Sequence, residues 1–189
     1  MIKTKNDLQR YICMDEHALG RRYSIFKSSD KILLFQRVLR FHEYYANNKS
    51  KSMFHRFMFY YYSMRHSFLG YKLGFDIPIN VFAEGLRINH WGLIIINPNV
   101  RIGRYCDIHQ GVNIGVQGYN DSDCPIIGDN VWIGPGVKMF GKIEIADNCQ
   151  IGANAVVNKS FKETGISIAG VPAKKISNNP NPYIRTYMI

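Results

Sequence analysis

Apolar residues recur along the chain with two different periods, and the change falls near Gly74. Before Gly74 they return every three or four positions, which is the spacing of an α-helix that buries one face. A first helix is predicted to begin at Thr4, because Thr4 with Asp7 three residues later resembles a capping box. The apolar stripe of this helix consists of Leu8, Tyr11, Ile12 and Leu19.

Two further helices are predicted in the same region. The second begins near Ser29 and Asp30, and the third spans Ser52 to Leu73. The third contains MFHRFMFYYYSMRHSF, which is aromatic on every side, so we expect neighbouring elements to enclose it. The alternative is that it lies on a membrane surface with its Arg, His and Lys side chains outward. The apolar stripe of the second helix consists of Ile32, Leu33, Val38, Leu39 and Tyr45.

Beyond Gly74 the chain carries a six-residue repeat. This period fits neither an amphipathic helix nor a flat strand, but it fits short strands joined by tight turns. Three hexapeptides make one coil of a triangular prism, successive coils pair as parallel sheet, and Gly, Asn and Asp supply the turns. The sequence therefore predicts a mainly β fold with a helical N-terminal part, a parallel β-solenoid whose hand the period does not fix. The repeated positions are Ile96, Ile102, Ile108, Ile114, Ile127, Ile133, Met139, Ile145, Ile151 and Val157.

The register of this repeat breaks once. Ile114 and Ile127 are 13 residues apart rather than 12, and the stretch between them, GVQGYNDSDCPI, is polar and rich in Gly and Asp. We expect a loop that leaves the prism wall. Because a solenoid has few places to build a pocket, such a loop is a candidate functional element. A tolerated surface insertion is the alternative.

Composition and charge limit the possible partners, location and metal content of the protein. Residues 1–76 hold 14 Lys and Arg against 6 Asp and Glu, whereas residues 77–189 hold 10 against 8. The basic residues of the N-terminal part either bind an anionic partner or form an ordinary solvent-exposed surface. No nucleic-acid-binding motif accompanies them. No apolar run is long enough to cross a bilayer and the polar start is unlike a secretory signal, so we expect a cytoplasmic location. No metal is expected, because zinc spacing is absent from the four cysteines, Cys13, Cys106, Cys124 and Cys149.

Four segments carry a resemblance to a known family. They are INHWGLIIIN (Ile88–Asn97), HQGVNIG (His109–Gly115), the stretch 126–157 and IAGVPAKKI (Ile168–Ile176). Together they resemble the hexapeptide-repeat acyltransferases, and among these the serine acetyltransferase branch. The resemblance implies a left-handed parallel β-helix, usually a homotrimer, that transfers acetyl from acetyl-CoA to a hydroxyl without a bound cofactor. On this basis we divide the chain into a helical region (1–74), a β-helix (75–176) and a C-terminal tail (177–189).

The same resemblance implies a catalytic base. In the family a D-H-x-x-G stretch carries the histidine that removes the proton of the acceptor hydroxyl, and His90 in NHWG occupies that position. An imidazole titrating near neutrality suits the task. Asp76, in a segment similar to the family's D-I-x-P, is the predicted carboxylate partner of His90, with Glu84 or a backbone carbonyl as competitors. His109 is a rival base, and the histidines at 17, 42, 55 and 66 are expected to be surface or packing residues.

Acetyl-CoA is expected to lie in the groove between two adjacent prisms of the trimer. By position in the family, its pantetheine arm passes Gly115, Val116, Pro135 and Ala153, and backbone amides along the arm add hydrogen bonds. The IAGVPAKKI segment closes over the nucleotide end. Its cations, Lys174 and Lys175, either meet the phosphates or are ordinary solvated charges.

Two departures from the family bear on the acceptor. The family's serine-binding loop has Arg-His-Pro, whose arginine holds the carboxylate of serine, where this chain has Asp123, Cys124 and Pro125. The aspartate before the family's histidine is Asn89 here, and losing an ion-pair anchor costs about 2–5 kcal/mol. We therefore expect a subgroup that O-acetylates capsule or lipopolysaccharide sugars or their precursors, the basic helical region attracting anionic polysaccharide or the inner membrane face. The residues predicted to contact the saccharide acceptor are Asn89, Trp91, His109, Asp123 and Cys124.

Two other functions stay open at this point. The first is serine O-acetylation in cysteine biosynthesis. Ile189 matches the terminal isoleucine of the family's docking tail, but the residues before it lack that tail's acidic, Gly-rich character. The second is a non-catalytic solenoid scaffold. A carbonic-anhydrase-like version would need three histidine ligands per site, and only His90 and His109 lie in the repeats.

Overall fold

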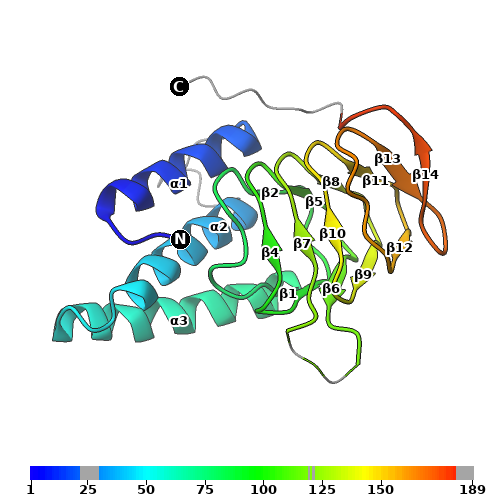
Figure 1. The fold of residues 1–189 in the computed structure, drawn as a ribbon. Coiled ribbons are helices and arrows are strands. Elements are labelled where there is room, and N and C mark those ends of the chain that lie inside the picture. Colours follow the sequence, from blue (N-terminus) through cyan, green and yellow to red (C-terminus); the bar gives the residue numbers. More distant parts are fainter. Residues whose placement is uncertain (22–29, 119, 121, 182–189) are drawn as a thin grey trace.

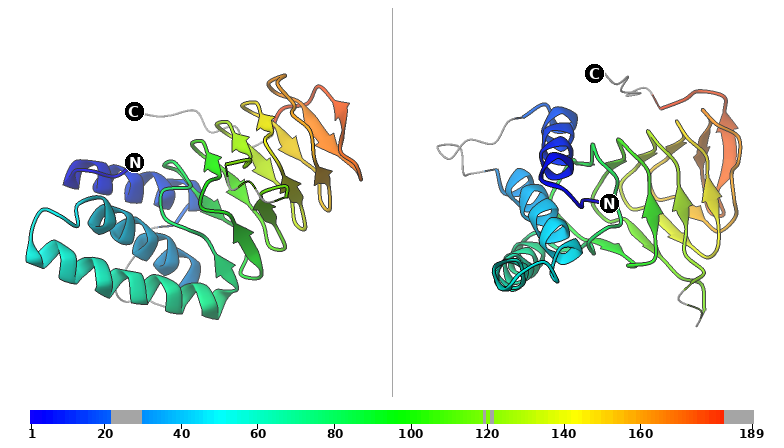
Figure 2. Two further views of the ribbon diagram at one scale, coloured as in Figure 1. Left: turned by 60° about the horizontal axis from the view of Figure 1, so that its bottom comes forward. Right: turned by 60° about the vertical axis from the view of Figure 1, so that its left-hand side comes forward.

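The computed structural model describes residues 1–21, 30–118, 120 and 122–181, and it places a helical layer at one end of a β prism (Figure 1). The helices are α1 (Lys5–Leu19), α2 (Lys31–Asn47) and α3 (Met53–Leu73). Figure 2 shows the three helices side by side, with the prism extending away from them. Of the predicted C-terminal tail, only residues up to Asn181 are described, and Ile189 lies outside the described residues.

Local sequence signals set the ends of the helices. The predicted capping box at Thr4 is present, because its hydroxyl accepts from the Asp7 amide while the Asp7 carboxylate accepts from the Thr4 amide. Asp30 and Ser52 cap α2 and α3, as predicted, by accepting from the amides of Leu33 and His55, while Ser29 lies outside the described residues. Gly74 ends α3 at φ 77°, a left-handed conformation that glycine adopts without strain.

The burial of α3 differs from the prediction. Only Leu69 and Gly70 of α3 are buried. The helix packs on α2 along one side, where Tyr62 stacks on Phe41 and Tyr45 at ring-centroid distances of 5.0 and 5.4 Å. The prediction that neighbours enclose α3 on every side is therefore wrong for a single chain, because the described residues supply a second layer on one side only.

The prism is built from three sheets whose strands run parallel from coil to coil, as predicted. The sheet orders are β1-β3-β6-β9-β12, β10-β7-β4 and β14-β13-β11-β8-β5-β2, and only the last pair, β13 with β14, is antiparallel. The strands are β1 (Phe75–Asp76), β2 (Arg87–Ile88), β3 (Ile94–Ile96), β4 (Arg101–Ile102), β5 (Asp107–Ile108), β6 (Asn113–Gly115), β7 (Ile126–Ile127), β8 (Trp132–Ile133), β9 (Lys138–Phe140), β10 (Glu144–Ile145), β11 (Gln150–Ile151), β12 (Val156–Val157), β13 (Ser167–Ala169) and β14 (Lys174–Ser177).

The repeated aliphatic side chains point inward and stack in columns. Ile96 lies opposite Ile114, Ile114 opposite Met139, and Met139 opposite Val157, and all four are buried. Full burial of each such side chain contributes about 1.5–3 kcal/mol. The columns therefore both set the register and supply the core of the prism.

The predicted loop leaves the prism between β6 and β7. Ile114 pairs with Met139 across 25 positions, whereas Met139 pairs with Val157 across 18, so this coil holds seven extra residues. In Figure 1 the chain after β6 projects below the prism before it returns at β7. The insertion does not disturb the stack, because every column resumes in register after it.

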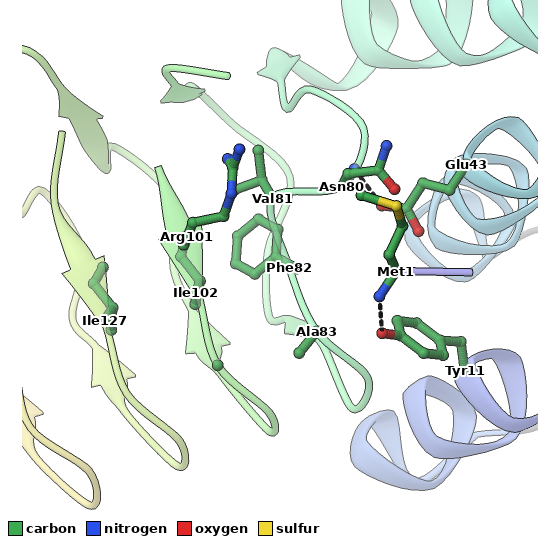
Figure 3. A pocket seen from close by; sticks show the side chains of 11 residues that line it. Met1, Tyr11, Glu43, Asn80, Val81, Phe82, Ala83, Arg101, Ile102 and Ile127 are labelled. Atoms are coloured by element: carbon green, nitrogen blue, oxygen red, sulfur yellow. Dashed lines mark hydrogen bonds between the residues drawn. The ribbon is translucent and has the colours of Figure 1, made fainter. Parts of the chain in front are cut away.

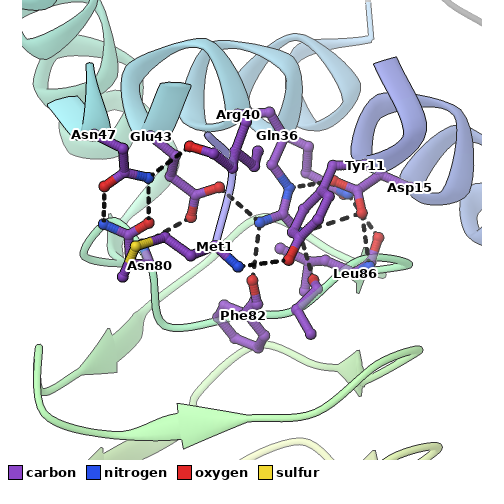
Figure 4. A network of polar contacts seen from close by, with 12 residues as sticks. Met1, Tyr11, Asp15, Gln36, Arg40, Glu43, Asn47, Asn80, Phe82 and Leu86 are labelled. Atoms are coloured by element: carbon purple, nitrogen blue, oxygen red, sulfur yellow. Dashed lines mark hydrogen bonds and ion pairs between the residues drawn. The ribbon is translucent and has the colours of Figure 1, made fainter. Parts of the chain in front are cut away.

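A buried arginine joins the helices to the first coil (Figure 4). Arg40 of α2 is fully buried and donates hydrogen bonds to Asp15 of α1 at 2.7 and 3.2 Å and to Glu43 at 2.9 Å. It also donates to the carbonyls of Phe82 and Ala83 at 3.0 and 2.7 Å. Burial alone would lower the pKa of Arg40, but the two carboxylates outweigh it and raise that pKa above its ordinary value.

The same helices supply hydrogen-bond partners to the backbone at the outer edge of β2, the end strand of its sheet. The Asp15 carboxylate accepts from the amides of Gly85 and Leu86 at 2.8 and 2.9 Å. Gln36 of α2 donates to the Leu86 carbonyl at 2.7 Å and accepts from the Ile88 amide at 3.4 Å. An end strand otherwise leaves buried backbone groups unpaired, so these side chains cap the open end of the prism.

Replacing Arg40 by Met leaves Asp15 and Glu43 buried without their cation. We expect Arg40→Met to lower the free energy of unfolding by about 3–5 kcal/mol in urea titrations at fixed protein concentration. Lys162→Gln is the matched control, because the exposed Lys162–Glu144 pair at 3.2 Å contributes no more than about 1 kcal/mol. Equal unfolding midpoints for the two variants would contradict the capping role.

A pair of histidines, His42 buried and His66 half-buried, joins α2 to α3. The Nδ1 atoms of His42 and His66 lie 3.0 Å apart, a contact that needs one nitrogen to donate and the other to accept. Phe59 and Phe35 pack against the two rings at centroid distances of 5.5 and 5.1 Å. Burial lowers the pKa of both His42 and His66 to about 4. The pair is therefore neutral in the folded protein near pH 7.

This pair makes stability depend on pH. Between pH 6.5 and 4 the unfolded chain binds more protons than the folded one, so the free energy of unfolding falls as the pH is lowered through this window. We expect His66→Gln to show a shallower fall between pH 6.5 and 5 than the unaltered chain, whereas His17→Gln on exposed α1 surface keeps the full fall. Urea titrations across this range measure it, and identical slopes in all three proteins would refute the assignment.

Candidate active site

His90 lies at the corner of the prism between β2 and β3, and its side chain is exposed. The corner is fixed by its backbone: the amide of Asn89 donates to the Ile108 carbonyl at 3.1 Å and that of Gly92 to the Leu73 carbonyl at 2.9 Å. Gly92 has φ 133°, and a Cβ there would lie 3.1 Å from the Cβ of Gln110. The glycine of NHWG is thus required by the turn that presents His90.

His109 occupies the same corner one coil further on. Its ring centroid lies 6.2 Å from that of His90 and 4.8 Å from that of Trp132. Nδ1 of His109 is 3.1 Å from the carbonyl oxygen of Ile133, which accepts only, so Nδ1 donates; in the neutral imidazole Nε2 is then the acceptor. The structure therefore brings the predicted base and its predicted rival together, with His109 held by the prism wall and His90 exposed.

Asp107 is a buried carboxylate beside this pair that sequence reasoning missed. Its side chain accepts from Nη1 of Arg87 at 3.2 Å and from Nδ2 of Asn89, and it lies 4.0 Å from Nδ1 of His109. It anchors the residue that precedes His90. The available signal was its register: Asp107 lies directly opposite Arg87 on the neighbouring strand, and opposite charges there attract.

The predicted carboxylate partners of His90 lie elsewhere on the first coil. Asp76 is exposed on β1 and lies opposite Ile95 in the next coil. Within the described residues, no hydrogen bond or ion pair joins Asp76 to His90, so their pairing stays a prediction. Glu84 instead forms an ion pair with Arg10 of α1 at 3.1 Å.

The predicted cofactor residues fall on two edges of one prism. Pro135 and Ala153 continue the corner of His90 and His109 down successive coils, and the amide of Asn154 donates to the Pro135 carbonyl at 2.8 Å. Gly115 is the last residue of β6, and Val116 follows it at the next corner of the prism. A whole sheet face separates these two groups in a single chain.

The remaining predicted residues lie at the end of the prism and in the loop. Lys174 and Lys175 are exposed on β14, and Lys175 pairs with Glu163 at 2.6 and 2.7 Å. Asp123 is half-buried where the loop returns to the prism. Cys124 is 5% exposed, and its thiol donates to Oδ1 of Asn97 at 3.3 Å, so its side chain offers little surface to a substrate.

Two hollows border these elements. One lies between α1, α2 and the first coils and contains none of the predicted site residues (Figure 3); it is lined by Met1, Tyr11, Glu43, Asn80, Val81, Phe82, Ala83, Arg101, Ile102, Gly103 and Ile127. The other adjoins the His90 corner through Trp91, which is 74% exposed. It carries three cations and is lined by Arg21, Asp30, Lys31, Ile32, Lys72, Leu73 and Trp91.

Two features are absent from the described residues. Among them, no three His, Cys, Asp or Glu side chains are grouped so that they hold a metal ion. Within the same ranges, none of the helices combines the length and the apolar character that crossing a bilayer requires.

Solved structures share this architecture. Soybean serine acetyltransferase complexed with serine matches with a TM-score of 0.70 and 22% identity, covering 91% of this chain and 70% of that one. The serine acetyltransferase of Brucella abortus strain S19 in complex with coenzyme A matches with a TM-score of 0.69 and 24% identity, covering 93% and 70%. At such identities the likeness establishes the fold, a left-handed parallel β-helix after a helical N-terminal part, as predicted.

Relatives in sequence carry the same name. The serine acetyltransferase of Synechococcus elongatus is 33% identical over 95 residues, which are 50% of this chain and 38% of the relative. That of Mycobacterium tuberculosis is 35% identical over 112 residues, 58% of this chain and 48% of the relative. The chain thus spans half or less of the length of these two relatives.

The prediction of a surface-polysaccharide acceptor is wrong. The relatives and solved structures named here are serine acetyltransferases, which favours the alternative of serine O-acetylation. That prediction of the acceptor rested on two departures from the family pattern, Asn89 and Asp123. The rest of the coil sequence, which resembles the serine acetyltransferases, was given less weight. An ion-pair anchor need not come from the loop, since α2 and α3 bring Lys31 and Lys72 to the hollow beside Trp91.

A relative that this chain covers over most of its length identifies the family. The family model for bacterial transferase hexapeptide (six repeats) matches residues 124–159. The serine acetyltransferase of Helicobacter pylori strain J99 is 33% identical over 128 residues, which are 66% of this chain and 74% of the relative. The chain belongs to the serine acetyltransferase family of hexapeptide-repeat proteins.

Proposed function

We propose that this protein transfers the acetyl group of acetyl-CoA to the hydroxyl of L-serine. The observation that carries the proposal is the exposed His90, held at a rigid corner in the NHWG stretch that matches the family's catalytic segment. The relatives named for this reaction and the solved complexes with serine and with coenzyme A support both substrates.

The chemistry follows from the exposed imidazole. A neutral hydroxyl is a poor nucleophile unless its proton leaves as it attacks, so His90 removes that proton while the serine oxygen adds to the thioester carbonyl. The tetrahedral intermediate then breaks its carbon–sulfur bond, and the CoA thiolate takes the proton from the His90 imidazolium. A backbone amide near Gly115 is the proposed donor to the oxyanion. Serine attacks the thioester directly, and no acyl-enzyme forms.

Acceptor contacts are proposed around the same corner. Asn89, Trp91 and His109 surround His90, with Nε2 of His109 available to accept a hydrogen bond from the serine ammonium. The carboxylate of serine suits the hollow beside Trp91. Its lining carries Arg21, Lys31 and Lys72 against one anion, Asp30, which pairs with Arg21 at 2.7 Å, so its net charge is positive. Asp123, at the position of the family's arginine, is then not required to hold that carboxylate.

Acetyl-CoA is proposed to bind between two copies of the chain in a homotrimer. Pro135 and Ala153 lie on the edge of His90, whereas Gly115 and Val116 lie on the next edge of the same prism. One extended pantetheine arm contacts both groups most simply when two copies lie side by side. The edge of one prism that carries Pro135 and Ala153 then faces the edge of its neighbour that carries Gly115 and Val116. Lys174 and Lys175 are the proposed cations near the phosphates, and Lys175 would exchange Glu163 for them.

Free thiol release from acetyl-CoA in the presence of L-serine tests the proposal. We expect His90→Ala to lower kcat by about 10²–10⁴-fold because it removes the general base. His109→Ala is expected to raise KM for L-serine with a smaller change in kcat, since His109 contacts the acceptor without taking its proton.

The matched control is His17→Ala on the exposed face of α1, which should leave both constants unchanged. Retained turnover in His90→Ala, or loss of turnover in His109→Ala alone, would remove His90 from the role of base. An unaltered chain that binds acetyl-CoA yet transfers nothing to L-serine would contradict the proposed acceptor.

A further inference from the structure

Asp107 uses its two carboxylate oxygens for different neighbours. Oδ2 accepts from Nη1 of Arg87 at 3.2 Å. Oδ1 accepts from Nδ2 of Asn89 and lies 4.0 Å from Nδ1 of His109. Arg87 begins β2, whereas Asn89 and His109 lie at the corner that carries His90. One oxygen of this buried carboxylate thus binds the cation at the start of the strand, and the other contacts residues of the corner.

The contact with Asp107 fixes the orientation of the Asn89 side chain. Asp107 forms an ion pair with Arg87, and a carboxylate in that state accepts hydrogen bonds only. The amide nitrogen of Asn89, and not its oxygen, must therefore face Asp107. Because the amide group is planar, Oδ1 of Asn89 is turned away from the carboxylate. Among the described residues, nothing donates a hydrogen bond to this oxygen.

The imidazole of His109 is held so that it also presents an acceptor. Its Nδ1 lies 3.1 Å from the Ile133 carbonyl oxygen and 4.0 Å from Oδ1 of Asp107, so two acceptors face the same ring nitrogen. Nδ1 therefore carries the proton, and in the neutral ring Nε2 is an acceptor on the opposite edge. No described residue donates to Nε2. The ring centroid of His109 lies 6.2 Å from that of His90, so one small molecule can contact both rings.

Two hydrogen-bond acceptors thus lie beside His90, Oδ1 of Asn89 and Nε2 of His109. A carboxylate only accepts hydrogen bonds and a hydroxyl does both, whereas an ammonium group only donates them, so it is the group that fits two acceptors best. We propose that Asp107 is a positioning residue that makes this corner select an acceptor molecule with an ammonium group beside its reacting hydroxyl. The inference rests on the proposed function, because it names the group by which the acceptor is recognised.

The isosteric change Asp107→Asn reverses the polarity of Asn89. Arg87 has only donors, so the new amide keeps its oxygen towards Arg87 and turns its nitrogen towards Asn89. Asn89 must then accept from that nitrogen, and its own Nδ2, a donor, turns away from position 107. An ammonium group meets a donor there instead of an acceptor. Adding Asn89→Asp restores an acceptor, because one oxygen of the carboxylate accepts from the amide at position 107 and the other remains available.

Acceptor preference in the full chain tests this role. Free thiol release from acetyl-CoA is measured with L-serine and with 3-hydroxypropanoate, which is serine without its ammonium group. We expect Asp107→Asn to raise KM for L-serine about tenfold and to change kcat less than about threefold, because acceptor binding rather than proton removal is affected. The preference for L-serine over 3-hydroxypropanoate should fall by about the same factor as KM rises. It should return in the double variant Asn89→Asp/Asp107→Asn.

Asp129→Asn is the matched control. Asp129 forms the same kind of ion pair with Arg104, at 2.7 Å, at the corner between β7 and β8. This change should leave KM and the acceptor preference as they are in the unaltered chain. Thermal unfolding is recorded for every variant, since a loss of folded protein lowers turnover of both acceptors equally and leaves their ratio unchanged. An unchanged ratio in Asp107→Asn, or no recovery in the double variant, would overturn the proposal.

Calorimetry separates this inference from the proposed function. Binding of L-serine and of 3-hydroxypropanoate is measured on the same proteins with coenzyme A present. A preference for L-serine that Asp107→Asn removes supports the ammonium subsite, even where the unaltered chain fails to acetylate L-serine and the proposed function falls. Equal binding of both compounds, or binding of neither, by the unaltered chain refutes the ammonium subsite, whichever acceptor is then acetylated.

Discussion

The buried guanidinium of Arg40 is the contact on which the arrangement of the molecule depends. A solenoid of stacked coils must end somewhere, and its end strand leaves backbone groups and apolar side chains without a neighbour. Arg40, Asp15 and Gln36 meet those groups on the chain from Phe82 to Ile88. His90 follows two residues later. The helical layer therefore caps the core and at the same time fixes the strand that leads to the site.

The solenoid was predictable from sequence because each coil needs an aliphatic residue at the same inward-pointing positions, and this requirement produces a regular six-residue pattern. The cap was not, because Asp15, Gln36 and Arg40 look like polar residues of amphipathic helices, and only the fold shows that they are buried. His90 was predictable from its motif. Asp107 was not, because its role depends on Arg87 and Asn89 one coil away. The acceptor was misjudged because the cations beside Trp91, among them Lys31 of α2 and Lys72 of α3, come from the helical region rather than from the loop.

The single chain carries the site in two separate parts. The edge with His90, His109, Pro135 and Ala153 bears the proposed base, and the edge with Gly115 and Val116 bears the other half of the proposed groove. In the proposed homotrimer, acetyl-CoA binding between prisms therefore requires two copies side by side. Activity and assembly are linked by this geometry.

The location of bound coenzyme A tests this account most directly. A crystal structure of the full chain with coenzyme A should show the thiol beside His90 of one copy and the pantetheine arm against Pro135 and Ala153. Gly115 of the neighbouring copy should complete the groove. Coenzyme A held within a single prism, or in the hollow between α1, α2 and the first coils, would contradict the account.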